Sequence, residues 1–309
     1  MSTTIAPDLL PLHATRSPLP VLAVVNSRAS GVRDAEAQRL EVHAALTEAG
    51  ASAETVSTGA LTELRGALER ADGRRVILVG GDGALHAVAN LGIRLPDLGL
   101  IPVGRANNIA RALGLPIDVR EAARVAVRGT VRPLDALLVE TGDRRVIAVE
   151  GVSAGFQAAG RARYRAENSG AVAQGAMALV ATLAELPHYT TRLSLDDEPA
   201  ATVDLEQLFL STLPLFAFGL RVNPLADVGD GVAEAIALRA PTRRRAVRLL
   251  LAARTGRHLV FDGVTLRRWR RARLIDPMPL AADGEPLGTT TARLTVLPGA
   301  LEVATAIEG

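Results

Sequence analysis

The stretch VILVGGDGALHAVANLG, residues 76–92, decides the fold. An apolar run ends in Gly80-Gly81-Asp82-Gly83, and apolar residues with helical spacing follow at once. A short apolar run bounded by glycines is typical of a buried strand, so the stretch predicts a strand that turns directly into a helix. Glycine permits so tight a turn. Asp82 would then either cap the new helix or lie beside a bound cation.

The same alternation of strand and helix extends on both sides of this stretch. Apolar runs predict strands at residues 19–26, 52–58, 74–80 and 98–104. Between and after them, helical spacing predicts helices within residues 32–50, 61–73, 84–91, 106–116 and 118–129. Strands that alternate with helices favour a parallel sheet covered on both faces. We therefore expect an α/β domain at residues 19–132, preceded by a loose leader at residues 1–18.

The alternation of strands and helices ends at about residue 131. Two strand-like runs surround Thr141-Gly142-Asp143, which is typical of a hairpin. A helical stretch is expected at residues 169–186. Further strand-like runs are expected at residues 189–195, 201–213, 231–240, 258–269, 272–277, 291–299 and 300–305. We therefore expect a β-rich antiparallel second domain at residues 133–309, whose last strands could return to the first domain.

The composition excludes several kinds of site. All 35 basic residues other than histidine are arginine, and there is no cysteine. A Walker-type lysine, a lysine base and any cysteine-based metal or redox chemistry are therefore excluded, so phosphate must be held by arginine, backbone N–H groups or a metal. The net charge is only +2 and aromatic residues make up 3% of the chain. Nucleic-acid binding is therefore not expected.

No apolar run approaches the length of about 18 residues that a membrane-spanning helix needs, and residues 1–20 lack the pattern of a signal peptide. We expect a cytoplasmic protein. Residues 240–258 read as a basic amphipathic helix, and residues 265–274 place five arginines around Trp269. This pattern suits an anionic membrane face, and it equally suits solvated charge on a helix and an edge strand. The sequence is also compatible with a homodimer.

Two glycine-bearing loops are expected at the carboxyl ends of strands, where open parallel sheets bind ligands. They are residues 80–83 and the sequence PVGRANNIAR at residues 102–111. Each leads into a helix N-terminus, where free N–H groups favour anions. Asp82 would repel a phosphate unless a cation lay between them. The residues thus fit either a nucleotide-phosphate site with a divalent metal near Asp82 or a plain tight turn between strand and helix that Asp82 caps.

The two loops together resemble the diacylglycerol kinase catalytic domain family, which includes bacterial lipid kinases and sphingosine kinases and is distantly related to NAD kinases. The family patterns are GGDGTxNEVxNGL and PxGTxNDFARxLGIP, and GGDGALHAVANLG and PVGRANNIARALGLP follow them in order. The resemblance covers most of the chain. Its other parts are VVNSRASG, RPLDALLV, VSAGF, GLRVNPLADVGDGVAEA, DGEP and LTVLPGALEV.

The resemblance implies an NAD kinase-like fold of two domains with ATP and Mg²⁺ in the cleft. The nucleotide site would be lined by Asn26, Thr58, Gly80, Gly81, Asp82, Gly83, Gly104, Arg105 and Asn107. Glu285 matches the family's candidate general base, and Asp82 would organise the metal. Asp230 matches a metal-binding aspartate, with Asp227 and Val232 as neighbours. The second domain would bind the lipid that accepts the phosphate, at a membrane surface.

The chain departs from the family patterns beside the phosphates. Ala84 and Arg105 replace two threonines, and Asn108 replaces an aspartate. A hydrogen bond to a charged group contributes about 1.5–3 kcal/mol, so such losses could slow turnover. Arg105 could compensate, because a guanidinium binds phosphate through two bonds. We therefore expect an ATP-dependent lipid kinase that acts on the hydroxyl of a diacylglycerol-like lipid. The alternatives are a catalytically impaired relative that binds nucleotide or a phosphorylated lipid without transfer, and a kinase with a soluble substrate.

Overall fold

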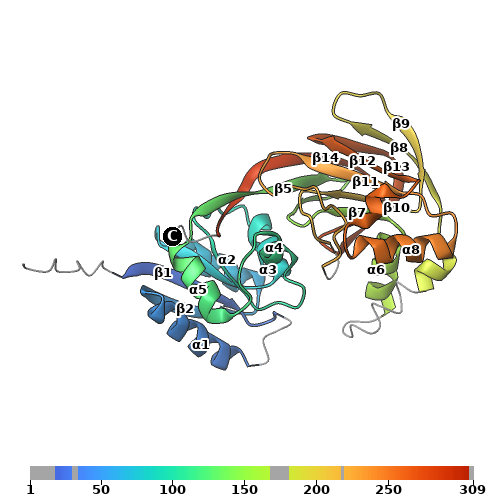
Figure 1. The fold of residues 1–309 in the computed structure, drawn as a ribbon. Coiled ribbons are helices and arrows are strands. Elements are labelled where there is room, and N and C mark those ends of the chain that lie inside the picture. The colour runs from blue at the N-terminus through green and yellow to red at the C-terminus, as the bar shows by residue number, and fades with distance from the viewer. Residues whose placement is uncertain (1–17, 30–33, 168–180, 217–218, 306–309) are drawn as a thin grey trace, which may run out of the picture.

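The chain forms two domains, which lie side by side in a computed structural model (Figure 1). The structure describes residues 18–29, 34–167, 181–216 and 219–305. Most of the helix expected at residues 169–186 lies outside these residues, as does the expected leader up to residue 17. The expected fold class, a parallel α/β domain followed by an antiparallel β-rich domain, is confirmed.

The first domain is built on a four-stranded parallel sheet in the order β2-β1-β3-β4. Its strands are β1 (Leu19–Asn26), β2 (Ala51–Thr58), β3 (Arg75–Gly80) and β4 (Gly99–Pro102). Its helices are α1 (Ala35–Glu48), α2 (Leu61–Glu69), α3 (Asp82–Asn90), α4 (Asn108–Ala112) and α5 (Val119–Arg128).

Both faces of this sheet are covered by helices. Successive side chains of a strand point to opposite faces. In β1, Val21 and Val25 therefore pack with α1 and α5, while Leu22 and Val24 pack with α2, α3 and α4. Burial on both faces explains why these strands are continuously apolar in the sequence. The carboxyl ends of β1, β3 and β4 are left free to form a site.

The second domain is built on a ten-stranded sheet. Eight strands follow the order β12-β11-β10-β7-β13-β14-β5-β6, and β8 and β9 extend from β13. The strands are β5 (Val131–Glu140), β6 (Arg145–Ala148), β7 (Val152–Gly155), β8 (Tyr189–Leu195), β9 (Ala201–Leu205), β10 (Gln207–Ser211), β11 (Ala233–Leu238), β12 (Val264–Trp269), β13 (Arg271–Ala282) and β14 (Glu285–Ala304). The helices are α6 (Phe156–Glu167), α8 (Arg243–Ala253) and the short 3₁₀ helix η1 (Arg257–Val260).

Several features of this domain differ from the expectation, including the run at residues 258–269, where a 3₁₀ helix, η1, precedes the strand β12. The helix α6 was not expected; it begins at Phe156, the last residue of the VSAGF stretch. The run at residues 201–213 forms two strands, because the chain turns at Glu206, whose buried carboxylate binds Arg239 and the backbone N–H of Ala240. Trp269 is buried in the domain core, so it cannot serve as an interfacial side chain.

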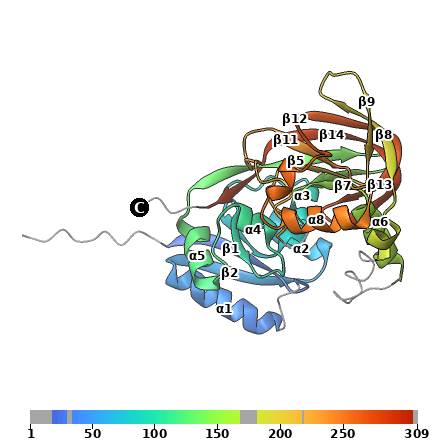
Figure 2. The ribbon, with the colours of Figure 1, turned by 45° about the vertical axis from the view of Figure 1, so that its right-hand side comes forward.

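β14 ties the two domains together. This strand begins in the second domain, and its end reaches the first, as both ribbon views show (Figures 1 and 2). There Val303 forms a parallel bridge with Leu98, just before β4. Leu301 and Val303 are buried in the core that α2 and α3 cover. The last strand thus returns to the first sheet.

Candidate nucleotide and acceptor pockets

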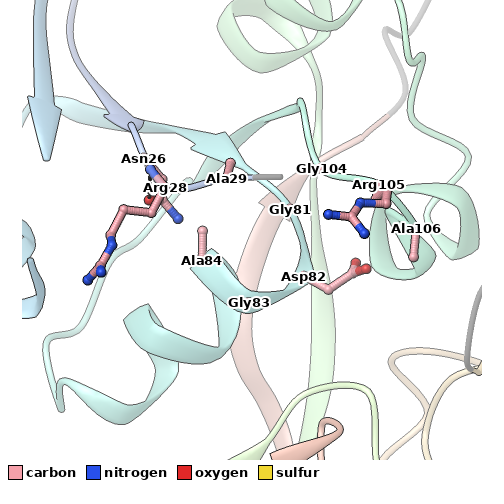
Figure 3. Close-up of a pocket in the computed structure, with 10 residues that line it drawn as sticks. All are labelled: Asn26, Arg28, Ala29, Gly81, Asp82, Gly83, Ala84, Gly104, Arg105 and Ala106. Carbon is pink, nitrogen blue, oxygen red and sulfur yellow. Dashed lines mark hydrogen bonds between the residues drawn. The ribbon is translucent and has the colours of Figure 1, made fainter. Parts of the chain in front are cut away.

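The first pocket opens where β1, β3 and β4 end. Its volume is about 330 Å³. It is lined by the three segments that follow these strands (Figure 3): Asn26, Arg28, Ala29, Gly81, Asp82, Gly83, Ala84, Gly104, Arg105 and Ala106. Six residues expected to line a nucleotide site therefore meet in one pocket. We call it the nucleotide pocket.

Two glycines let the loops of this pocket approach each other. A Cβ atom on Gly104 would lie 2.6 Å from the Cα atom of Gly81, and one on Gly81 would lie 2.9 Å from the Cα atom of Gly104. Real Cβ atoms do not approach other heavy atoms so closely, so any larger residue would push the loops apart. The two glycine loops therefore form one continuous backbone surface.

Asp82 joins the two loops through hydrogen bonds. It is the first residue of α3, whose N-cap is Gly81, and its carboxylate does not cap its own helix. Instead its two oxygens accept the backbone N–H groups of Asn108 and Ile109, each at 3.0 Å. Burial raises the pKa of Asp82; these hydrogen bonds oppose the rise and the nearby charge of Asp283 adds to it. Asp82 therefore caps α4 from the neighbouring loop.

The other residues expected in this site lie close behind the pocket. Gly80 ends β3, and Thr58 ends β2 beside Asn26, where it is buried. Asn107 is the N-cap of α4 with a left-handed φ of 49°. Its amide nitrogen donates to the carbonyl of Gly104, and its buried Oδ1 has no hydrogen-bond partner within the described part of the chain. The amide oxygen of Asn107 is thus a hydrogen-bond acceptor that a ligand behind the loop could use.

Arg105 and Ala84 occupy the positions where the family patterns carry threonine. The Arg105 side chain is exposed and lines the nucleotide pocket opposite Asn26 and Arg28 (Figure 3). Ala84 is only 3% exposed, and its methyl group would lie 2.6 Å from a Cβ on Gly80. Relative to the family patterns, the pocket has therefore gained a guanidinium and lost two hydroxyls.

A second pocket lies between the domains, next to the first. It has a volume of about 80 Å³. Both domains line it, with Ala106, Asn108, Glu150, Ser153, Gln157, Arg161, Phe216, Asp283 and Gly284. Ala106 lines both pockets, so they adjoin at the loop before α4. We call the second one the acceptor pocket.

Asp283 fixes the wall of the acceptor pocket. Its carboxylate accepts the backbone N–H groups of Val149, Glu150 and Gly151 at 2.7–3.0 Å. Nδ1 of His86, from α3 of the first domain, lies 2.8 Å from its Oδ2. Four groups thus surround one carboxylate, which holds the β6–β7 loop, the β13–β14 turn and α3 together.

Glu150 was not expected as a site residue. Its Oε2 accepts a hydrogen bond of 2.9 Å from the Asn108 side chain, and it lines the acceptor pocket. Burial, followed by the charges of Asp82 and Asp283, raises the pKa of Glu150 to about 8. The hydrogen bond from Asn108 and the charge of Arg161 oppose that rise. The only sequence signal was a lone acidic residue in the apolar run VIAVEGVSAGF.

Glu285 lies elsewhere. It is exposed and lines a separate surface hollow with Arg144, Arg145 and Pro286. Asp283, two residues earlier, is the carboxylate of the DGE sequence that lines the acceptor pocket. The structure therefore does not bring Glu285 together with Asp82.

The residues expected to hold a metal in the second domain lie in the turn before β11. Asp230 forms an ion pair with Arg268, and its Oδ1 accepts the N–H of Val232 at 3.0 Å. Asp227 accepts the N–H of Gly229 at 3.3 Å. Among the described residues, no group of three or more His, Cys, Asp or Glu side chains is arranged to hold a metal. The cation that faces Asp230 is a guanidinium, so this turn does not fit a metal in the conformation described.

Comparison with known proteins identifies the class and then the family. Residues 20–139 match the diacylglycerol kinase catalytic domain, and residues 150–305 match the YegS C-terminal NAD kinase beta sandwich-like domain. Together these matches cover both domains of the fold, which places the chain in the NAD kinase-like class of two-domain proteins. The chain belongs to the diacylglycerol kinase and YegS-like family of lipid kinases.

Relatives in several bacteria match most of the chain. A protein of Chromohalobacter salexigens named probable lipid kinase YegS-like is 30% identical over 236 residues, which are 74% of each chain. The diacylglycerol kinase of Mycobacterium tuberculosis is 28% identical over 248 residues, 74% of this chain and 75% of that one. A crystal structure of a Bacillus anthracis diacylglycerol kinase superposes with a TM-score of 0.68 at 17% identity, covering 93% of this chain and 97% of that one. The last likeness concerns the fold alone.

Proposed function

We propose that this protein transfers the γ-phosphoryl group of ATP to the hydroxyl of a diacylglycerol-like lipid. The observation that carries the proposal is the adjacency of the nucleotide and acceptor pockets across the loop at residues 104–108. Phosphoryl transfer depends mainly on positioning and charge, so a donor site that adjoins an acceptor site is its main structural requirement. Family membership supports the same reaction.

The nucleotide pocket offers what a triphosphate needs. The α3 N-terminus and the glycine loops present backbone N–H groups, and Arg105 adds a guanidinium that can bind two phosphate oxygens. The oxygen ligands near the pocket suit Mg²⁺ as well, because Asp82 supplies a carboxylate and the amide oxygen of Asn107 has no hydrogen-bond partner among the described residues. We propose that Asp82 would hold Mg²⁺ with Asn107 close by. A bound Mg²⁺ would neutralise phosphate charge during transfer.

Apolar surface beside the acceptor pocket suits a lipid. Phe216 lines this pocket and packs edge-on against Phe209, with ring centroids 5.1 Å apart. Phe209 in turn lines an almost wholly apolar hollow together with Leu220, Leu249 and other side chains. We propose that an acyl chain follows this surface while the hydroxyl lies near Glu150. Arg161 favours a neutral or anionic lipid over a cationic amino alcohol.

The protein would meet its lipid at a membrane surface through α8. This helix exposes Val247, Leu250 and Leu251. Exposed arginines flank them at positions 243, 244, 254 and 257, and residues 240–261 contain no acidic side chain. Apolar side chains framed by arginine suit an anionic bilayer. No helix of the described residues is long and apolar enough to cross a membrane.

Assay of a mixed lipid extract with labelled ATP and Mg²⁺ tests the proposed reaction. The wild type is expected to label one lipid class, and Asp82→Asn to reduce that product at least about tenfold. Asp72→Asn makes the same change of side chain at an exposed position that lines neither pocket, so it is the control and is expected to keep full activity. Absence of any product would overturn the transfer reaction. ATP binding without product, measured by calorimetry, would favour the binding-only alternative.

A further inference from the structure

The acceptor pocket contains a carboxylate in an unusual arrangement with Asn108. The family pattern has an aspartate where this chain has Asn108, so α4 has lost a negative charge at that position. The amide nitrogen of Asn108 lies 2.9 Å from Oε2 of Glu150, on the opposite wall. A carboxylate is therefore still present at this place, but the second domain supplies it.

The other carboxylates near the two pockets accept more hydrogen bonds than Glu150 does, or face elsewhere. Asp283 accepts three backbone N–H groups and lies against His86. Both oxygens of Asp82 accept backbone N–H groups of α4. Glu285 lines a different hollow. Among the described residues, the Glu150 carboxylate accepts one side-chain hydrogen bond, from Asn108, so lone pairs of this carboxylate remain for a ligand.

A second feature of the pocket also suits a hydroxyl ligand. Gln157 lines the same pocket as Glu150, and its buried Oε1 has no hydrogen-bond partner in the described residues. A buried acceptor without a donor costs free energy unless a ligand or water satisfies it. The charged groups around Glu150 are Asp82, Asp283, His86 and Arg161. Of these, only Arg161 and Asp283 line the pocket with it.

We propose that Glu150 is a catalytic residue that accepts the proton of the lipid hydroxyl, a role that rests on the proposed phosphoryl transfer. The hydroxyl oxygen forms its new bond to the γ-phosphorus as the bond to the β–γ bridging oxygen breaks. ADP leaves with that bridging oxygen. The hydroxyl proton passes to Oε of Glu150, which later releases it to solvent. Asn108 is a positioning residue, because its amide holds Oε2 in place.

The pKa of Glu150 supports this role. A general base works best when its pKa lies near the working pH, and that of Glu150 is raised to about 8. The activity should therefore rise with pH until Glu150 has lost its proton. A carboxylate with an ordinary pKa would give no such rise above pH 6.

Steady-state kinetics with diacylglycerol in mixed micelles test the inference across pH 5.5–9. Glu150→Gln, which keeps the shape of the side chain, is expected to lower kcat about 10²- to 10⁴-fold and to abolish the rise of kcat with pH. Glu69→Gln, which makes the same change at an exposed position on α2 outside both pockets, is expected to stay within about threefold of the wild type. The Kd for ATP, measured by calorimetry, should be the same in all three proteins, because Glu150 does not line the nucleotide pocket.

Several outcomes would overturn the inference alone. In the first, the wild type is active and Glu150→Gln hardly changes kcat. In the second, Glu150→Gln lowers kcat, but kcat still rises with pH as in the wild type. Glu150→Asp covers the case in which Glu150→Gln does not fold. It should retain a rise of kcat with pH at reduced kcat, and a flat profile would count against the proposal. An inactive wild type would overturn the proposed function, and this inference with it.

Discussion

His86 and Asp283 join the two domains across 197 positions of the sequence, with Nδ1 of His86 2.8 Å from Oδ2 of Asp283. The side chain of Asp283 is only 5% exposed. The contact aligns α3, which begins in the nucleotide pocket, with the β13–β14 turn that lines the acceptor pocket. The contact therefore fixes the position of the two pockets relative to each other.

His86→Ala is expected to destabilise the protein by about 1–3 kcal/mol, because a buried carboxylate loses a hydrogen-bonded partner. Urea unfolding measures this difference. The control is His43→Ala, which removes an exposed imidazole whose Nδ1 lies 3.2 Å from the hydroxyl of Thr55. Equal stability of the two variants would show that the contact between the domains contributes little.

Arg105→Ala is expected to weaken ATP binding about ten- to a hundredfold, because charge-assisted bonds to phosphate contribute about 1.5–3 kcal/mol. Calorimetry with ATP and Mg²⁺ measures the Kd. Arg243→Ala, which removes an exposed arginine on α8, is the matched control and should leave the Kd unchanged. If both variants bind ATP like the wild type, Arg105 does not replace the missing threonines.

The raised pKa of Glu150 makes stability depend on pH. The pKa is about 8 in the folded protein against 4.5 for an ordinary glutamate, so the folded state holds a proton that the unfolded state has lost. The stabilising contribution is complete below about pH 4.5 and is lost as the pH rises to about 8.

Thermal unfolding across this range checks the sign. The Tm of the wild type relative to Glu150→Gln is expected to fall as the pH rises from 5 to 8.5. A difference in Tm that stays constant, or that grows with pH, would contradict the raised pKa. The measurement needs neither nucleotide nor lipid, so it is independent of the proposed reaction.

Val247→Glu combined with Leu251→Glu is expected to weaken binding to phosphatidylglycerol vesicles at least about tenfold, because both side chains are exposed on α8 and burial of one valine or leucine contributes about 1.5–3 kcal/mol. Vesicle sedimentation measures the binding, which should also weaken with added salt. Phosphorylation of a short-chain, water-soluble diacylglycerol serves as the control and should be unaffected. Unchanged sedimentation would exclude α8 as the membrane contact.

The sequence predicted the first domain well because local patterns determine it. The apolar run at residues 19–26 matches β1 residue for residue, since a strand buried on both faces has almost only apolar side chains. The second domain was harder. Residues 291–299 and 300–305 were expected as two strands, but they belong to β14, whose pairing with β5 shifts between Leu297 and Leu301. A strand that continues through an irregular segment has no local signature.

The candidate site could be predicted only in part. The glycine loops were recognisable because their chemistry lies in consecutive residues. Glu150 was not recognisable as a site residue. Its place in the pocket depends on contacts with Asn108, 42 positions earlier, and with Asp283, 133 positions later. Likewise the role of Asp82 as the cap of α4 depends on a contact 26 positions away. Such pairings follow from how strands are ordered in space, which spacing along the chain does not reveal.

The return of β14 to the first sheet has a consequence for how the protein is made. Residues 19–128 leave the ribosome first and contain all four strands of the parallel sheet. Leu98 nevertheless receives its partner only when Val303 has been translated, and until then the core lacks the buried side chains of Leu301 and Val303. The parallel domain is therefore synthesised before the second domain but completed only after it, and the proposed nucleotide binding should mature only when the whole second domain has emerged.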